Sequence, residues 1–293
     1  MLTPYLNLLL DSSPRQIYYR LRRGFKHKEQ TNIKAFDDKH PCVFVLSTGR
    51  AGTQTLSALL GLANNIFAYH EPKPILYGLS KLSYQYFDDI TARVILREAF
   101  LTARKDRLIY SQNCERGYVE TSPGATFLGP AILDAVKGVR FIHIVRDPRE
   151  VVRSGMRRKW YEGHTADCTR IIPRAGTEEQ KAWNNFNSFQ KNLWLWTETN
   201  RQIWEFTKNL PKERILLVRS EDIFSAYGDT IGKIFSFIGS TMPSESKIVH
   251  ILGKKLNSQK TGSFPTPSDW TDDMIINLRT ISGQTASLLG YSI

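Results

Sequence analysis

The feature that most constrains the fold is a short apolar run that leads into a glycine-containing loop and then into a helical pattern. The run Cys42–Leu46 has the unbroken hydrophobicity of a strand buried on both faces, as in a parallel sheet. Residues 47–53 supply two glycines, and residues 56–63 place leucine and alanine at helical spacing. A strand, a loop and a helix in this order are typical of anion-binding turns, because the helix N-terminus presents free N–H groups.

The rest of the chain repeats this alternation of strands and helices. We expect strands at residues 66–69, 118–120, 139–145 and 214–218. We expect helices at residues 84–104, 127–136, from 148 onward, 180–208, 228–239 and at the C-terminal end. The alternation predicts an α/β fold with a P-loop-type turn and a mainly parallel central sheet flanked by helices on both faces. Ligands of such folds bind at the carboxyl ends of the strands.

Composition narrows the classes of protein. Lysine and arginine number 40 against 28 acidic residues, a net charge of +12, which implies an anionic partner without naming it. The 41% hydrophobic content excludes a disordered chain, and no apolar run approaches the roughly 18–20 residues that span a bilayer. Leu6–Leu10 is too short for a signal-peptide core. Three distant cysteines without a C-x-x-C spacing predict no metal site and a reducing, cytoplasmic setting.

Charge also suggests how the chain is divided. Residues 1–34 hold seven Lys/Arg and two acidic residues, so we expect residues 1–40 to form a basic N-terminal arm. Residues 41–293 would then form a single α/β domain. Because Leu8–Leu10 and Tyr18–Arg23 mix apolar and basic residues, the arm suits weak peripheral contact with an anionic membrane surface.

The loop Ser47–Thr55 has the composition of a phosphate cradle. Gly49 and Gly52 let the backbone approach an anion closely, and Arg50 adds a charged side chain with several donors. The loop departs from the Walker A sequence because Thr53 stands where that motif has lysine. A tight turn without a ligand is the alternative interpretation.

A second basic motif follows the strand at 139–145. Arg146 stands at the strand end, Asp147 suits a helix N-cap, Pro148 suits the first helical turn, and Ser154 follows on the helix. Arginine and serine in this arrangement can converge on one anion. A solvated helix face is again the alternative. Together the two motifs predict two anion sites at one sheet edge, which suits a ligand with phosphates at both ends.

At these residues the chain resembles the sulfotransferases. Ser47–Thr55 is similar to their 5′-phosphosulfate loop and Arg146–Ser154 to their 3′-phosphate motif, and the resemblance covers roughly residues 41–272. It implies a metal-independent transferase that uses 3′-phosphoadenosine-5′-phosphosulfate (PAPS) and releases the bisphosphate PAP. By position, the cofactor-binding residues would be Gly49, Arg50, Ala51, Gly52, Thr53, Gln54, Thr55, Arg146, Ser154, Asn257, Lys260, Thr261 and Gly262.

The resemblance also places the acceptor side. Transfer to a hydroxyl group, or to an amine, needs a base, and Glu71 matches the position of a carboxylate base, with His70 as its rival and Arg50 as the charged catalytic partner. The acceptor would be a saccharide or small molecule, and its contact residues would be Lys73, Tyr77, Trp160 and Tyr161. Many carbohydrate sulfotransferases have lysine where this chain has Thr121, which leaves the acceptor class open.

Two other functions fit parts of the sequence. A magnesium-dependent P-loop kinase lacks its Walker lysine here, although dependence on ATP and Mg²⁺ would support it. A non-catalytic basic protein that binds nucleotides or polyanions would explain the net charge but not the paired strand-end motifs. We expect no nucleic-acid partner, and the sequence does not give the oligomeric state.

Overall fold

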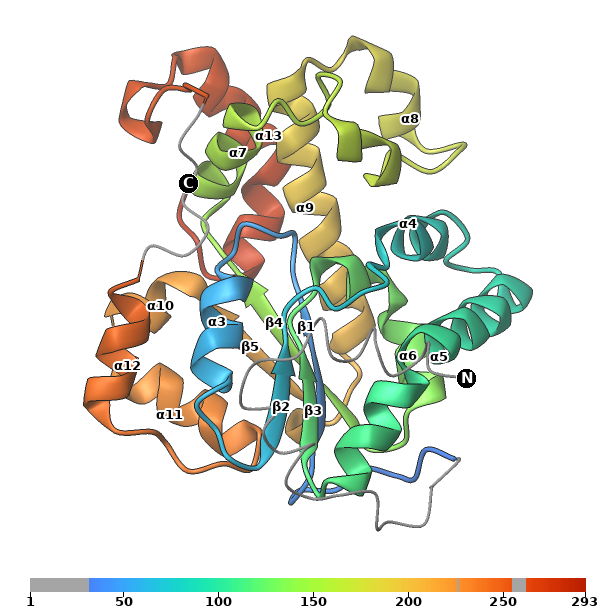
Figure 1. Ribbon diagram of the computed structural model, residues 1–293. Coiled ribbons are helices and arrows are strands. Elements are labelled where there is room, and N and C mark those ends of the chain that lie inside the picture. The colour runs from blue at the N-terminus through green and yellow to red at the C-terminus, as the bar shows by residue number, and fades with distance from the viewer. Residues whose placement is uncertain (1–31, 226, 255–261) are drawn as a thin grey trace.

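The computed structural model describes residues 32–225, 227–254 and 262–293 (Figure 1). Its centre is a five-stranded sheet with the order β2-β3-β1-β4-β5, and all four strand pairs are parallel. The strands are β1 (Cys42–Leu46), β2 (Ile66–Tyr69), β3 (Gly117–Glu120), β4 (Val139–Val145) and β5 (Ile215–Arg219). The predicted parallel α/β architecture is therefore confirmed.

Helices connect the strands and cover both faces of the sheet (Figure 1). The α-helices are α3 (Thr53–Leu60), α4 (Tyr77–Gln85), α5 (Ile90–Asn113), α6 (Gly129–Ala135), α7 (Pro148–Arg157), α8 (Glu178–Ala182), α9 (Ser188–Thr207), α10 (Ser220–Ser225), α11 (Tyr227–Phe237), α12 (Glu245–Leu252) and α13 (Asp272–Leu288). Short 3₁₀ turns include η1 (Pro123–Leu128), η2 (Thr165–Thr169), η3 (Trp183–Asn185), η4 (Lys212–Arg214) and η5 (Pro267–Asp269).

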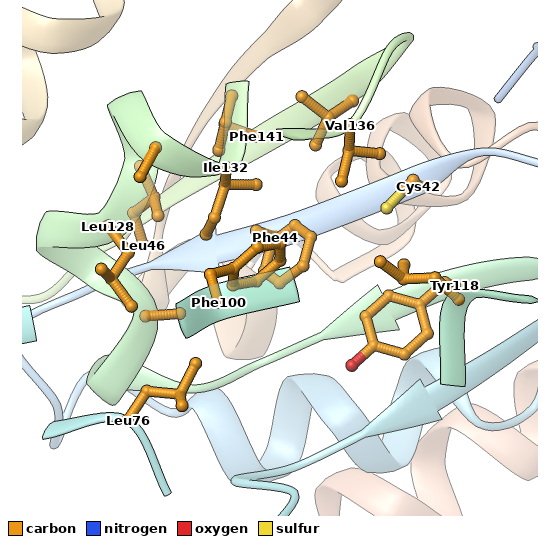
Figure 2. Packing of buried hydrophobic residues seen from close by; sticks show 14 of the residues in the cluster. Cys42, Phe44, Leu46, Leu76, Phe100, Tyr118, Leu128, Ile132, Val136 and Phe141 are labelled. Atoms are coloured by element: carbon orange, nitrogen blue, oxygen red, sulfur yellow. The ribbon is translucent and has the colours of Figure 1, made fainter. Parts of the chain in front are cut away.

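Strand β1 is the middle of the core and sends alternate side chains to opposite faces. Cys42, Phe44 and Leu46 join a cluster with residues of α5, α6 and α9, and the ring of Phe44 lies 5.6 Å from that of Phe100 (Figure 2). Val43 and Val45 join a second cluster with α3, α11 and α12. Burial on both faces explains why β1 reads as an unbroken apolar run.

Two long predicted helices are each interrupted in the structure. The helix expected at 84–104 is split between α4 and α5, because Asp89 caps α5 by accepting a hydrogen bond from the Ala92 N–H. The helix expected at 180–208 is broken before α9, where Asn187 and Gln190 form a capping box. Helices α10 and α12 were not predicted. These caps were readable in the sequence, but the apolar periodicity continued across them.

The last residues of the predicted N-terminal arm pack against the domain. Phe36 is buried in the β1 cluster, its N–H donates to the Lys137 carbonyl, and Asp38 forms an ion pair with Arg140. Residues 1–31 lie outside the described residues, so the function of the arm stays a prediction. The three cysteines are free, and the cytoplasmic setting also stays a prediction. Within the described ranges, every helix is too short or too polar to cross a membrane.

A completely buried ion pair joins α5 to the end of β3. Arg104 Nε and Nη2 donate to the two carboxylate oxygens of Glu120 at 2.7 and 3.0 Å, and the Tyr118 hydroxyl donates to the same carboxylate at 2.6 Å. The remaining donors of Arg104 reach the carbonyls of Pro72 and Pro74 at 3.1 and 3.0 Å. One arginine thus fixes the loop that follows β2 to the end of β3.

His143 is a core residue of β4, as the sequence analysis expected. Its side chain is 1% exposed, and Nε2 donates to Asn200 Oδ1 at 2.9 Å because the Asn200 amide nitrogen already donates to the Trp196 carbonyl. Burial lowers the pKa of His143 to about 4. The imidazole is therefore neutral in the folded protein at neutral pH.

We predict that His143 makes the folded state acid-sensitive. Its folded pKa of about 4 lies below the usual 6.5, so the unfolded chain binds the proton first. The stability from the neutral imidazole is complete above pH 6.5 and is lost as the pH falls towards 4, by roughly 3 kcal/mol. Urea unfolding of the wild type and His143→Gln between pH 7 and 4 measures this loss. Parallel pH profiles for the two proteins would contradict it.

We predict a strong coupling between Arg104 and Glu120. Arg104→Met leaves a buried carboxylate without its cation and should lower the free energy of unfolding by about 3–5 kcal/mol. The double variant Arg104→Met/Glu120→Gln removes the charge and keeps an acceptor for Tyr118, so it should recover about half of that loss. Urea unfolding of both variants decides the matter, and a single variant as stable as the wild type would show that the pair does not matter for folding.

Candidate functional site

The loop after β1 is folded as a cradle at the N-terminus of α3. Gly49, Arg50 and Gly52 all have positive φ, at +79°, +58° and +84°. The Ser47 hydroxyl accepts the Gly49 N–H at 2.8 Å, and Thr126 Oγ1 donates to the Ser47 carbonyl at 2.9 Å. Gly52 occupies the N-cap of α3, and no side chain caps that end. The loop and the helix N-terminus thus form the kind of backbone concavity that binds anions.

The two sequence motifs meet at Arg50. Arg146 Nη1 donates to the Arg50 carbonyl at 3.2 Å, and Arg50 Nε donates to Ser154 Oγ at 3.0 Å. Asp147 caps α7 and Pro148 occupies its first turn, which confirms the predicted start of that helix. Because Ser154 Oγ accepts from Arg50, its own hydroxyl hydrogen remains available to a ligand.

The electrostatic environment of Arg50 is strongly positive. Burial, together with the charges of Arg158 and Arg146, lowers the pKa of Arg50 to about 10. The guanidinium stays protonated at neutral pH, so the site keeps several cations close together. Such a cluster attracts an anion that can contact more than one of them.

Two cavities meet at Arg50 and Thr53. The nucleotide-side cavity, about 250 Å³, is bounded by the start of α3, by Arg146 and by the start of α10. Gln54 and Thr55, two of the predicted cofactor-binding residues, line this cavity. The acceptor-side cavity, about 360 Å³, extends from the loop past Glu71 to η2. Both volumes are in the range of small-molecule sites or just below it.

His70 and Glu71 both line the acceptor-side cavity but offer different chemistry. His70 Nδ1 lies 2.8 Å from the Thr121 carbonyl, which can only accept, so Nδ1 carries the proton and Nε2 is the acceptor. Glu71 Oε1 accepts from the Tyr77 hydroxyl at 2.8 Å. Burial and the neighbouring Glu71 raise the pKa of Tyr77, so it remains a donor. Either His70 or Glu71 can take a proton from a hydroxyl group.

Glu71 sits in a constrained segment. Its φ is +45°, an uncommon value for glutamate, and Arg104 binds the carbonyls of Pro72 and Pro74 directly after it. Arg107 Nη2 adds a bond to the Lys73 carbonyl at 3.3 Å. The Lys73 side chain is exposed and, in the described part of the chain, lies outside the residues that line either cavity.

Only some of the other predicted acceptor contacts line the acceptor-side cavity. Tyr77 and Trp160 line the acceptor-side cavity. Tyr161 is turned away from it, since its hydroxyl donates to the Ile171 carbonyl at 2.7 Å and its ring packs edge-on against Trp183. Burial raises the pKa of Tyr161, so it remains a neutral phenol.

Of the residues predicted to close over the cofactor after α12, the structure describes only Gly262. Asn257, Lys260 and Thr261 lie outside the described residues. Gly262 has φ +79°, its carbonyl accepts from Arg157 Nε at 3.0 Å, and a Cβ there would lie 2.1 Å from the Arg157 carbonyl oxygen. Glycine is therefore required where this loop returns to the end of α7.

Several site residues were missed in the sequence. Arg158, Arg170 and Lys81 line the acceptor-side cavity, and Ser220 and Glu221 line the nucleotide-side cavity. Ser220 and Glu221 directly follow β5 at the carboxyl edge of the sheet, which was a usable signal. The segment containing Arg170 has irregular backbone, and its position depends on tertiary contacts that no local pattern reveals.

The arrangement joins a proton acceptor, a row of cations and a backbone anion cradle. Such a site can deprotonate a hydroxyl group and stabilise negative charge on a leaving group. Among the described residues, no three His, Cys, Asp or Glu side chains are grouped so that they could hold a metal ion.

Comparisons with known proteins identify the family and a shared fold. The sequence model of the sulfotransferase family matches residues 41–244, and curated protein sequences gave no match. The fold is similar to the sulfotransferase domain from the curacin biosynthetic pathway, with 17% identity, a TM-score of 0.54, and 89% of this chain and 100% of that chain covered. It is also similar to a sulfotransferase from Alicyclobacillus acidocaldarius, with 14% identity, a TM-score of 0.50, and 87% and 97% covered. The chain therefore belongs to the sulfotransferase family of enzymes.

Proposed function

We propose that this enzyme transfers the sulfuryl group of PAPS to a hydroxyl group of a small molecule or saccharide, with Glu71 as the base. The observation that carries the proposal is the meeting of the two motifs at Arg50. Arg146 contacts the Arg50 carbonyl, Ser154 contacts the Arg50 guanidinium, and Arg50 lines both cavities. A donor nucleotide on one side and an acceptor on the other would place the transferred group beside Arg50.

The residues on the nucleotide side fit a bisphosphorylated nucleotide. The backbone of residues 49–55 and the Arg50 side chain would hold the 5′-phosphosulfate, because the concavity and the α3 N-terminus favour anions. Arg146 and the free hydroxyl hydrogen of Ser154 would hold the 3′-phosphate. PAPS supplies the sulfuryl group when it is bound.

Glu71 is the better-placed base for the acceptor hydroxyl. The Tyr77 hydroxyl binds one carboxylate oxygen and so orients the side chain, while Arg104 fixes the segment behind it. The second carboxylate oxygen is left to take the proton, which requires hydrogen-bond reach of the acceptor hydroxyl. His70 is the alternative base, because its Nε2 is an acceptor in the same cavity.

Arg50 would act on the leaving group. Arg50 lines both cavities, and its guanidinium carries a full charge at neutral pH because its pKa of about 10 is still well above 7. A fixed donor aimed at developing charge typically contributes a factor of about 10²–10³ to the rate. Reorganisation is small because Ser154 already holds the side chain.

We predict that PAP binds without a metal ion. At a concentration of about a hundred dissociation constants it should stabilise the protein by about 2.7 kcal/mol and raise the unfolding midpoint by several degrees. Thermal unfolding with PAP, with ATP plus Mg²⁺ and with neither ligand measures the shift. A shift with ATP and Mg²⁺ alone would replace the proposal with a P-loop kinase, and no shift would favour a non-catalytic protein.

We predict that Glu71→Gln abolishes transfer while PAP still binds. The amide keeps an acceptor for the Tyr77 hydroxyl but cannot take a proton, so kcat should fall by about 10²–10⁴. Steady-state rates with labelled PAPS, using the fastest acceptor from a screen of phenols and sugars, give kcat, and calorimetry gives PAP affinity.

His70→Asn is the matched control for this prediction. Asparagine can keep a donor for the Thr121 carbonyl but lacks the Nε2 acceptor. It should retain most of the rate if Glu71 is the base. A full loss in His70→Asn beside an active Glu71→Gln would reverse the assignment.

A further inference from the structure

The far wall of the acceptor-side cavity is built by the short turn η2 and its two flanking residues. His164 precedes η2, Arg170 follows it, and both line the cavity. Lys81 of α4 also lines the cavity, and its Nζ donates to the Cys168 carbonyl in η2 at 2.8 Å. Three donor side chains from two elements are therefore brought together at one turn.

Arg170 is held in a fixed orientation. Its guanidinium lies 4.0 Å above the centroid of the Trp160 ring, and its Nε donates to Asp167 Oδ1 at 2.7 Å. The side chain is only 14% exposed. Across the described residues, neither Nη group has a protein acceptor, so both can serve a ligand in the cavity. Because stacking on Trp160 and the Asp167 contact already restrict the side chain, Arg170 loses less conformational entropy when a ligand binds.

His164 presents a donor to the same cavity. Its Nδ1 accepts the N–H of Ala166 at 3.0 Å, so in the neutral imidazole the proton resides on Nε2. Asp167 Oδ2 completes the capping box by accepting the His164 N–H at 2.9 Å. His164 is thus the opposite of His70, which presents an acceptor.

The lining of this cavity is rich in donors and poor in acceptors. Among its described side chains, Glu71 is the one carboxylate, and Tyr77 already binds one of its oxygens. Asp167 balances the formal charge of Arg170, so this turn favours an anion through its directed hydrogen-bond donors rather than through net charge. A ligand group with several acceptor oxygens would match these donors, which are the Nη groups of Arg170, the remaining donors of Lys81 and Nε2 of His164.

The donors of η2 are separate from those at the phosphate loop. Arg158 lines the cavity as well, and its charge helps to lower the pKa of Arg50. The cavity is thus lined by three arginines, with Arg50 in the loop after β1 and Arg170 after η2. Under the proposed function, the sulfuryl group would take the Arg50 end.

We propose that Arg170, Lys81 and His164 form an anion subsite that selects acceptors already carrying a carboxylate, sulfate or phosphate group. This inference rests on the proposed function, because it assigns the cavity to the acceptor. The acceptor hydroxyl would face Glu71 while its anionic group lies against η2. Phe127, Trp160, Ile171 and Leu195 also line the cavity and suit a compact ring between the two ends.

The test uses the full chain saturated with PAP and two matched pairs of probes. 4-Hydroxybenzoate is compared with its methyl ester, and glucose 6-phosphate with glucose, by calorimetric titration. The anionic member of at least one pair should bind about tenfold or more tightly than its neutral partner. The pair that shows the preference distinguishes an aromatic carboxylate from a sugar phosphate.

Arg170→Gln should remove about tenfold or more of the anion affinity and leave PAP affinity unchanged. Arg97→Gln is the matched control, because Arg97 lies on α5 outside both cavities and pairs with Glu98. Should Arg170→Gln fold poorly, Lys81→Gln tests the same subsite from α4.

Two outcomes separate this inference from the proposed function. Equal or weaker binding of every anionic probe, with PAP bound normally, overturns the anion subsite and leaves the proposed function intact. Failure of PAP itself to bind overturns the proposed function. Loss of anion binding in Arg97→Gln as large as in Arg170→Gln would also overturn the subsite, because the effect would then come from overall charge.

Discussion

The site depends on the backbone of one loop, in which Gly49, Arg50 and Gly52 all take positive φ values. Glycine adopts this region freely, but a left-handed arginine costs roughly 1–2 kcal/mol. The strained residue is also the one whose carbonyl accepts from Arg146 and whose side chain donates to Ser154. The loop after β1 and the start of α7 therefore stabilise each other. Without that contact the two predicted anion-binding motifs would be two unrelated turns on one sheet edge.

A second strained residue, Glu71, is supported in the same way from the other side. It follows β2, whose residue Tyr69 pairs in register with Glu120 of β3. Glu120 binds Arg104, and Arg104 binds the carbonyls of the segment after Glu71. A buried ion pair adds little net stability, because desolvation offsets most of its attraction. Its effect here is positional, since it ties the candidate base to the sheet rather than to a surface loop.

The sequence predicted what local chemistry determines. The unbroken apolar run of β1, the N-cap Asp147 and the core position of His143 all follow from short-range patterns, and the structure agrees with each. The sequence did not predict positions that depend on tertiary contacts. Trp160 and Asp167 hold the guanidinium of Arg170, and Lys81 of α4 binds the turn η2 just before it. Tyr161 is turned away by its bond to the Ile171 carbonyl. Neighbouring residues in that segment read alike in sequence but face different environments in the fold.

The net charge of +12 says more about the site once the positions of individual arginines are known. Arg50 lies in the loop after β1, and Arg146 and Arg158 flank the two ends of α7. Burial and the charges of Arg158 and Arg146 lower the pKa of Arg50. Lowering the pKa of a cation means that the folded state disfavours its charge, so the cluster opposes folding when it is considered alone. An anion bound among these arginines reverses the sign of that interaction. Under the proposed function, ligand binding and stability are therefore coupled at this edge of the sheet, because like charges are buried around one backbone cradle.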